Sequence, residues 1–208
     1  MWKSFALVLL IAACGRAPEK PAEKPAEQPA RPPTQRAAPA APASGPASPA
    51  AAIAVTTSAG DPVVSVARSG SDLAVTYDGG VLHGRRKGEK RKYESLEVKF
   101  GDEGGFKVRT LDGKLLWKVK VTPDKIKVSD NEENRNPYEL KIKDAKVKVY
   151  APGDRLLGEV RVRGDHVDVG GKYRAAGTSA DAFYGVELLD GVPPRERAVI
   201  FAELAMKR

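Results

Sequence analysis

The chain has very few cysteines and histidines, two residue types that often serve as nucleophiles, acid–base groups or metal ligands. It contains one cysteine, Cys14, and two histidines, His83 and His166. His83 has no cysteine or second histidine near it in the sequence. His166 takes the polar position of a strand pattern whose apolar positions are Val167 and Val169. These residues form no catalytic set or metal-ligand spacing, so we predict a non-enzymatic protein that binds no metal and needs no cofactor.

Known catalytic motifs do not change this prediction. The sequence has no Gly-x-Ser-x-Gly, His-Glu-x-x-His, P-loop or Rossmann glycine pattern. Residues 130–136 are rich in Asp, Asn and Glu, but Arg135 stands where an EF-hand loop needs glycine and Lys141 where it needs the closing glutamate. We therefore expect a polar hairpin loop there.

Cys14 ends a segment with the order of an export signal. Lys3 precedes the apolar run 5–13, which closes in small residues and is too short to span a bilayer as a helix. The sequence Ile11-Ala12-Ala13-Cys14 resembles the lipobox of bacterial lipoproteins. That resemblance implies cleavage of a signal peptide, residues 1–13, and acylation of Cys14. The alternative is a chance thiol in an ordinary signal peptide.

The lipobox resemblance also implies a location. Two or more acyl chains anchor a protein stably to a membrane that it does not cross. In the lipoprotein class an Asp after the cysteine tends to retain the protein in the inner membrane, and here that residue is Gly15. We therefore expect the bacterial outer membrane, with the protein facing either the periplasm or the exterior.

Residues 14–52 have the composition of a tether. After the cysteine, the segment consists almost entirely of Ala, Pro, Glu, Lys and Ser, with the quasi-repeat Pro-Glu-Lys-Pro-Ala-Glu-Lys-Pro-Ala. Such a segment has too little apolar surface to offset the entropy of ordering, so we predict a disordered spacer.

Residues 53–208 are long enough for one domain with its own core, and their hydrophobic pattern has period two. In 96–100 and 115–121 apolar residues alternate with Lys or Glu, and 140–149 repeat the pattern. Gly-rich turn signals separate these runs. The pattern predicts a mainly β fold, an antiparallel meander of about a dozen short strands forming a barrel or a sandwich.

An internal duplication supports this fold class. Residues 106–128 align without gaps on residues 147–169, and the matched pairs include Val108/Val149, Leu116/Leu157 and Val119/Val160. Two copies are too few for a solenoid, so we expect them to share one sheet. Trp117 aligns with Gly158, which means that the two halves cannot pack identically.

The end of the chain changes to a helical pattern. Pro194 suits a first helical position, and apolar residues from 198 to 206 are interrupted only by Glu203, which could pair with Lys207 one turn later. We predict a largely apolar, buried C-terminal helix over about 194–206.

Many strands joined by Asp-Gly turns and followed by an apolar helix resemble the tubby-like fold of scramblases and LURP-one-related proteins. The local match is 182–190 leading into 197–200, which is similar to that family's final strand, acidic turn and helix start. The resemblance implies a barrel around a central hydrophobic helix.

Charge suggests the kind of partner. The net charge is +8, of which residues 1–52 account for +3, leaving +5 for residues 53–208. A basic surplus favours anionic neighbours such as lipid headgroups or an acidic envelope polymer, and the expected compartment argues against nucleic acid. The densest basic segment, 84–92, reads either as a solvated hairpin loop or as a site for anions or headgroups, formed by Arg85, Arg86, Lys87, Lys90, Arg91 and Lys92.

Two functions remain open from the sequence. The first is an outer-membrane lipoprotein whose β-rich domain is a non-enzymatic binding or structural module of the envelope. The second is a lipid-binding or lipid-handling protein with a tubby-like barrel. In both, the protein meets the membrane through a lipid anchor at Cys14.

Overall fold

The computed structural model describes residues 53–101 and 103–207. These residues form fourteen strands, one 3₁₀ helix and one α-helix. The elements are β1 (Ile53–Thr57), β2 (Pro62–Ser69), β3 (Asp72–Tyr77), β4 (Gly80–Lys87), β5 (Lys90–Lys92), β6 (Leu96–Phe100), β7 (Phe106–Thr110), β8 (Leu115–Val121), β9 (Lys125–Ser129), β10 (Tyr138–Lys143), β11 (Lys146–Ala151), β12 (Arg155–Arg163), β13 (His166–Val169), β14 (Tyr173–Ala176), η1 (Ala182–Leu188) and α1 (Pro194–Ala205).

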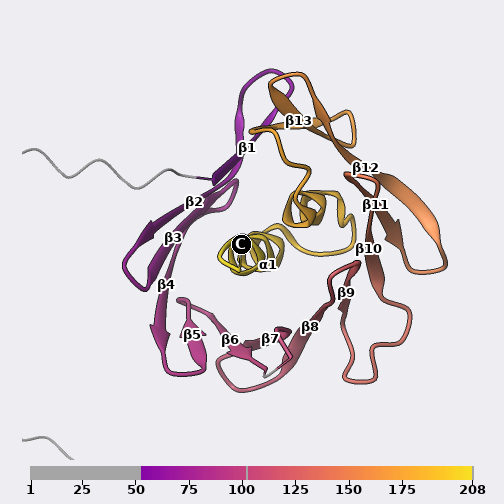
Figure 1. Ribbon diagram of the computed structural model, residues 1–208. Helices are drawn as coiled ribbons and strands as arrows, with labels where there is room; N and C mark the ends of the chain where they lie inside the picture. The colour runs from indigo at the N-terminus through magenta and orange to yellow at the C-terminus, as the bar shows by residue number, and fades with distance from the viewer. Residues whose placement is uncertain (1–52, 102, 208) are drawn as a thin grey trace, which may run out of the picture. The chain divides into compact units, whose positions relative to one another are not determined.

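The strands form a closed antiparallel barrel in which each strand pairs with its neighbours in sequence. The barrel closes where β1 pairs with β14, with Val55 opposite Ala175. Closure removes the exposed strand edges that would otherwise pair with other chains. The predicted fold class is confirmed, and of the two alternatives, barrel and sandwich, the structure is the barrel (Figure 1).

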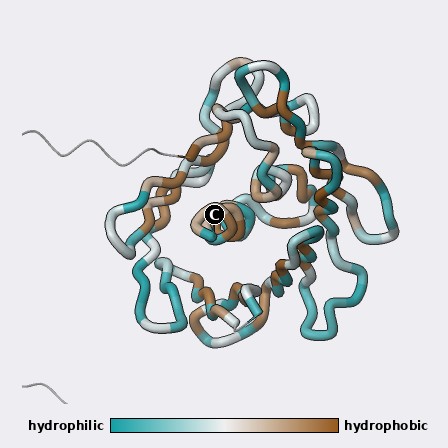
Figure 2. The backbone as a smooth tube through the Cα atoms, viewed as in Figure 1, coloured by the Kyte–Doolittle hydropathy of each residue, from teal (hydrophilic) through white to brown (hydrophobic). Residues whose placement is uncertain are grey.

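The barrel encloses the two helices. A barrel grows wider with strand number, and about eight strands already give an interior just wide enough for side chains to fill. Fourteen strands therefore leave a lumen that needs further protein to fill it. In Figure 1, α1 and η1 lie inside the ring of strands. Figure 2 shows hydrophobic residues along α1, η1 and the strands, and hydrophilic residues at many of the hairpin turns.

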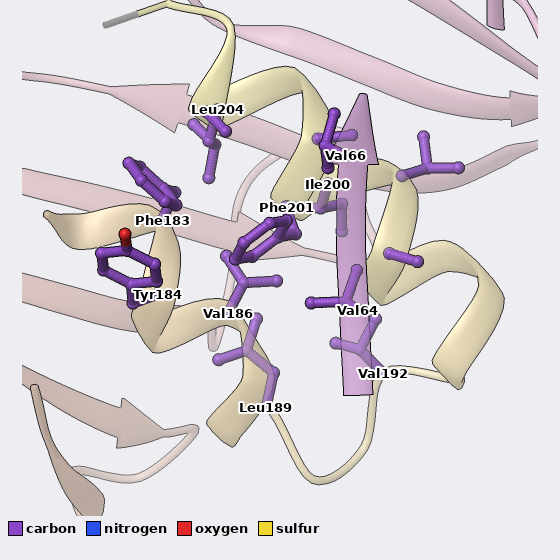
Figure 3. Packing of buried hydrophobic residues seen from close by; sticks show 14 of the residues in the cluster. Val64, Val66, Phe183, Tyr184, Val186, Leu189, Val192, Ile200, Phe201 and Leu204 are labelled. Atoms are coloured by element: carbon purple, nitrogen blue, oxygen red, sulfur yellow. The ribbon is translucent and has the colours of Figure 1, made fainter. Parts of the chain in front are cut away.

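The core forms where α1 meets η1 and the strand lining. Phe201 of α1 packs against η1: its ring centroid is 5.4 Å from that of Phe183 and 6.2 Å from that of Tyr184, both on η1. On the other side of α1, Val64 and Val66 of β2 face the same cluster (Figure 3). Ala198 to Ala205 are all buried. The predicted helix is thus an internal one.

Residues 182–188 form η1, and the expectation of a final strand at this position was wrong. The physical reason is topological: β14 already pairs with β1, so the closed sheet has no free edge for another strand. The segment instead turns into the lumen. A Cβ on Gly185 would lie 2.8 Å from Val149, so η1 packs almost directly on β11.

The internal duplication corresponds to β7–β9 and β11–β13. The two copies even share an irregularity, because the register shifts after Val108 in one copy and after the matching Val149 in the other. They differ at the position where Trp117 aligns with Gly158. There the second copy leaves room for Leu188 of η1, whose Cδ1 lies 3.1 Å from the position of a Cβ on Gly158. The asymmetry between the two copies therefore makes room for η1 to pack against β12.

The packing of Leu188 leads to a prediction for Gly170. A Cβ there would lie 2.6 Å from Leu188 Cδ2, and the residue has a φ of +64°. We expect Gly170→Ala to lower the free energy of unfolding, measured by urea denaturation, by about 1–3 kcal/mol through strain and the clash. Gly171→Ala is the matched control, since Gly171 has a φ of +71° and nothing within 4 Å of its Cβ position. Equal losses of unfolding free energy in the two variants would show that the contact with Leu188 does not add to the destabilisation.

Candidate functional site

The predicted basic segment is a hairpin formed by β4 and β5. The cross-strand pairs are Arg85 with Lys92, Arg86 with Arg91, and Lys87 with Lys90. Like charges directly opposite one another destabilise a sheet, so these cross-strand pairs favour nearby anions. Period-two alternation divides the six cations between the two faces of the sheet, so they do not form a single group.

Arg91 points into the barrel, so it does not belong to the candidate anion site. Its side chain is 5% exposed, and its Nε lies 3.0 Å from Oε1 of Glu203 on α1. Tyr93 donates a hydrogen bond of 2.8 Å to the same oxygen, and Arg91 donates one of 2.7 Å to the carbonyl of Ser71. Burial, first, and the nearby carboxylate raise the pKa of Tyr93, and burial raises the pKa of Glu203. Arg91 thus fastens the helix to the barrel.

The expected helical pair between Glu203 and Lys207 was also wrong. Glu203 faces Arg91, whereas Lys207 donates to the carbonyl of Gly104 and its Nζ lies 5.4 Å from the centre of the Phe106 ring. A carboxylate buried in a barrel lumen needs a partner that is also buried, and Lys207 is exposed and lies beyond the end of α1.

The remaining hairpin cations lie at the surface. Lys90 forms an ion pair with Glu97 at 2.8 Å, and Arg85 lies 3.9 Å from Asp72. Arg86 stacks over the Phe100 ring at 4.8 Å. Lys87 and Lys92 are exposed. Within the described residues Lys87 and Lys92 form no ion pair, so these two side chains are available to an anion.

The hairpin is one end of a much larger basic surface. Strands β5 to β12 carry Lys or Arg at most positions that face away from the lumen, and we refer to these residues as the cationic wall: Lys90, Lys92, Lys99, Lys107, Arg109, Lys118, Lys120, Lys125, Lys127, Lys141, Lys143, Lys146, Lys148, Arg161 and Arg163.

Strand register places many of these cations directly opposite one another. Lys107 pairs with Lys99 on one side and Lys118 on the other. Lys146 likewise lies between Lys143 and Arg161. Side chains at such positions are about 5 Å apart at Cβ, and like charges there lower stability. The wall therefore concentrates positive potential that a negatively charged partner would relieve.

Acidic side chains on this surface are few and shared. Glu139 binds Lys127 at 3.0 Å and Lys141 at 3.1 Å, and hydrogen bonds from these lysines help to lower its pKa against the opposing effect of burial. Glu159 lies 3.0 Å from Arg161 and 3.8 Å from Lys148. Glu139 and Glu159 each contact two cations, so the wall keeps a cationic excess.

One carboxylate from a loop already occupies part of the wall. The loop between β9 and β10 is the polar hairpin loop expected over 130–136, and its Glu132 reaches back over β7 and β8. The Glu132 carboxylate lies 2.7 Å from Lys107, 2.8 Å from Arg109 and 3.7 Å from Lys118. The hydrogen bond from Lys107, first, and the three positive charges lower the pKa of Glu132. This part of the wall therefore binds a carboxylate.

Sequence reasoning missed the wall, although a signal was present. In the sequence, the lysines of β6 to β11 are visible only as polar positions that alternate with apolar residues within each strand. A surface hollow of about 580 Å³ lies over this region and is lined by wall residues such as Lys99, Lys107 and Lys120. Only the register of the closed sheet shows that these lysines form one surface.

The other predicted positions are outside the site. Cys14, the signal segment 1–13 and the tether 14–52 lie outside the described residues. His83 is exposed on β4, and His166 on β13 lies 3.1 Å from Asp165. Among the helices in the part of the chain that the structure describes, none has the length and apolar character required to cross a membrane.

Comparisons with protein-family models, with curated proteins and with solved structures find no match to this chain.

Proposed function

We propose that this protein is a lipid-anchored protein of the bacterial outer membrane whose barrel is a non-enzymatic binding module for an anionic polymer of the cell envelope. The observation that carries the proposal is the cationic wall, where register sets like charges side by side over β5 to β12. A polyanion lying on this wall gains attraction and also relieves the repulsion between neighbouring lysines.

The anchor rests on the pattern at Cys14. The apolar run 5–13, which ends in Ile11-Ala12-Ala13 directly before Cys14, supports acylation, and Gly15 supports sorting to the outer membrane. Metabolic labelling with a palmitate analogue, followed by separation of the two membranes, tests both points. Label in the parent chain, none in Cys14→Ser, and recovery in the outer membrane are expected. An unlabelled parent chain contradicts the anchor.

The filled lumen favours surface binding over the lipid-handling alternative. An acyl chain needs an apolar cavity, and here α1 and η1 occupy the inside of the barrel with Val199, Ile200 and Phe201 fully buried. Headgroups could still meet the β4–β5 hairpin. Sedimentation of residues 15–208 with phosphatidylglycerol vesicles, in parallel with binding to polygalacturonate, separates the two functions. Binding to vesicles alone favours the alternative.

Two wall lysines provide the first test of the binding surface. Lys143 and Lys146 face each other on β10 and β11, and neither forms an ion pair within residues 53–101 and 103–207. We expect Lys143→Gln with Lys146→Gln to weaken polygalacturonate binding by about tenfold to thirtyfold, because each cation near an anionic surface contributes about 1 kcal/mol. Fluorescence anisotropy of the labelled polymer measures the affinity.

The matched control is Arg68→Gln with Arg174→Gln. These exposed arginines lie on β2 and β14, away from the wall, and replacing them lowers the net charge by the same amount as the lysine pair. We expect less than a threefold loss for this control. Equal losses for both pairs would show that only total charge matters and that the wall is not the site.

Glu132 gives a prediction of opposite sign. Glu132→Gln removes the carboxylate that neutralises Lys107, Arg109 and Lys118. We expect the variant to bind polygalacturonate several-fold more tightly than the parent in low salt, and the gain to shrink as salt rises. Glu133→Gln, at the neighbouring exposed position of the same loop, is the control and should change nothing. A loss of affinity in Glu132→Gln would contradict a competing role for its carboxylate.

A further inference from the structure

A second candidate site lies away from the wall, where η1 and α1 meet the barrel lining. It is a pocket of about 310 Å³ between β12, β14, η1 and the start of α1. We call it the Glu187 pocket. Its volume is at the low end of small-molecule sites, which run from about 300 to 1,000 Å³, so it suits a ligand of about one sugar ring.

The inner part of the pocket carries an unsatisfied acid. The Glu187 side chain is 3% exposed, and one of its oxygens, Oε2, lies 3.3 Å from Nε of Arg197. The other oxygen, Oε1, is buried and accepts no hydrogen bond within the described part of the chain, and Arg197 Nε is also left without one. A buried polar atom without a hydrogen-bond partner destabilises the folded chain, so a ligand that supplies the missing partner binds favourably there. A ligand hydroxyl, which both donates and accepts, meets both needs.

The rim of the pocket is basic. Lys172 is exposed and forms no ion pair among residues 53–101 and 103–207, while Arg155 binds Asp190 at 2.7 Å. With Arg197, the pocket holds three cations against two carboxylates. Burial raises the pKa of Glu187 to about 7, so near neutral pH part of the molecules carry it as the neutral acid. The charge balance favours an anionic group on the ligand near Lys172.

The pocket also offers apolar contact. Leu156 is 51% exposed, one of the few large apolar side chains at the surface of the described residues, and Tyr173 lines the same pocket. Aliphatic and aromatic side chains beside charged groups match the two characters of a sugar ring, which has C–H faces and hydroxyl edges.

We propose that the Glu187 pocket binds a sugar acid, with ligand hydroxyls on Glu187 and Arg197 and the ligand carboxylate on Lys172. The proposal is independent of polymer binding at the wall, because the two sites share no residue.

The test is an NMR titration of ¹⁵N-labelled residues 15–208 with glucuronate, glucose and acetate. Glucuronate should shift the amides of Leu157, Tyr173 and Leu188 and should bind at least tenfold more tightly than either glucose or acetate, because only glucuronate supplies both hydroxyls and a carboxylate. Equal binding of acetate and glucuronate would reduce the pocket to a simple anion site and overturn the proposal. Absence of saturable shifts in these residues would also overturn it.

Variants assign the contacts. Lys172→Ala changes an exposed residue and should leave the fold intact while weakening glucuronate binding about tenfold; Lys87→Ala is its exposed control outside the pocket. Lys143→Gln with Lys146→Gln should leave glucuronate binding unchanged even where polymer binding is lost. If the wall pair abolishes both, the pocket is not a separate site. If Lys172→Ala binds like the parent, the assigned carboxylate contact is wrong.

Discussion

Replacing Arg91 with Met lowers the free energy of unfolding by about 3–5 kcal/mol at neutral pH, the range expected when one partner of a buried ion pair is removed. The variant leaves Glu203, 1% exposed on α1, without its cation and with only the hydrogen bond from Tyr93. Urea denaturation followed by circular dichroism measures the change. Lys92→Met is the matched control, because Lys92 is the exposed neighbour on β5, and its effect should stay within about 0.5 kcal/mol.

The pH dependence of the Arg91→Met loss identifies its cause. Burial already raises the pKa of Glu203, and removal of Arg91, whose charge lowers that pKa, raises it further. Glu203 can therefore take up a proton at acid pH, so the loss should be smaller at about pH 5 than at about pH 8. Adding Glu203→Gln removes the stranded charge while keeping an acceptor for Tyr93, and it should recover most of the stability. If the loss of stability is independent of pH and Glu203→Gln does not recover it, Arg91 contributes through packing and not through its charge.

Replacing Glu187 with Gln removes a pH-dependent stability difference of about 3 kcal/mol. Burial raises the pKa of Glu187 from 4.5 to about 7, and each pKa unit corresponds to about 1.36 kcal/mol. Because the folded state holds this proton more tightly than the unfolded state, the contribution is fully present below pH 4.5 and is lost as pH rises through about 7. The parent chain should become less stable over that range relative to Glu187→Gln.

The comparison of the two chains isolates Glu187, since Glu203 titrates in the same direction in both. We expect Glu187→Gln to match the parent at about pH 5 and to be more stable at about pH 8 in urea denaturation. Glu89→Gln, at an exposed turn position, should follow the parent at every pH. If the free energies of unfolding of the parent and of Glu187→Gln change in parallel from acid to alkaline pH, Glu187 is not protonated in the folded state near neutrality.

Sequence pattern was sufficient for the local structure of the domain. Apolar residues at alternate positions separated by turn glycines specify strands, because the side-chain period of a strand is two and a half-buried sheet needs one apolar face. The duplication 106–128 and 147–169 was readable for the same reason, and the structure even repeats the register shift after Val108 and Val149. Pro194 and the apolar run after it specified a helix that is buried.

The partners of the charged residues could not be read in this way. The sequence places Arg91 among basic neighbours and predicts a pair between Glu203 and Lys207, which are four residues apart in a helical pattern. The actual contact joins Arg91 to Glu203, which are 112 positions apart in the sequence, and it exists because the helix enters the lumen of a closed sheet. The strand expected at 182–190 failed for a related reason, since closure of β1 on β14 leaves no edge to extend.

The amino-acid order alone thus determined the strands, their apolar faces, the repeat and the terminal helix, because each depends on spacings of a few residues. Tertiary structure alone decided which lysines lie side by side, which arginine turns inward and where an acid is left without a hydrogen-bond partner. These features depend on register and on closure of the barrel, which bring together residues far apart in the chain.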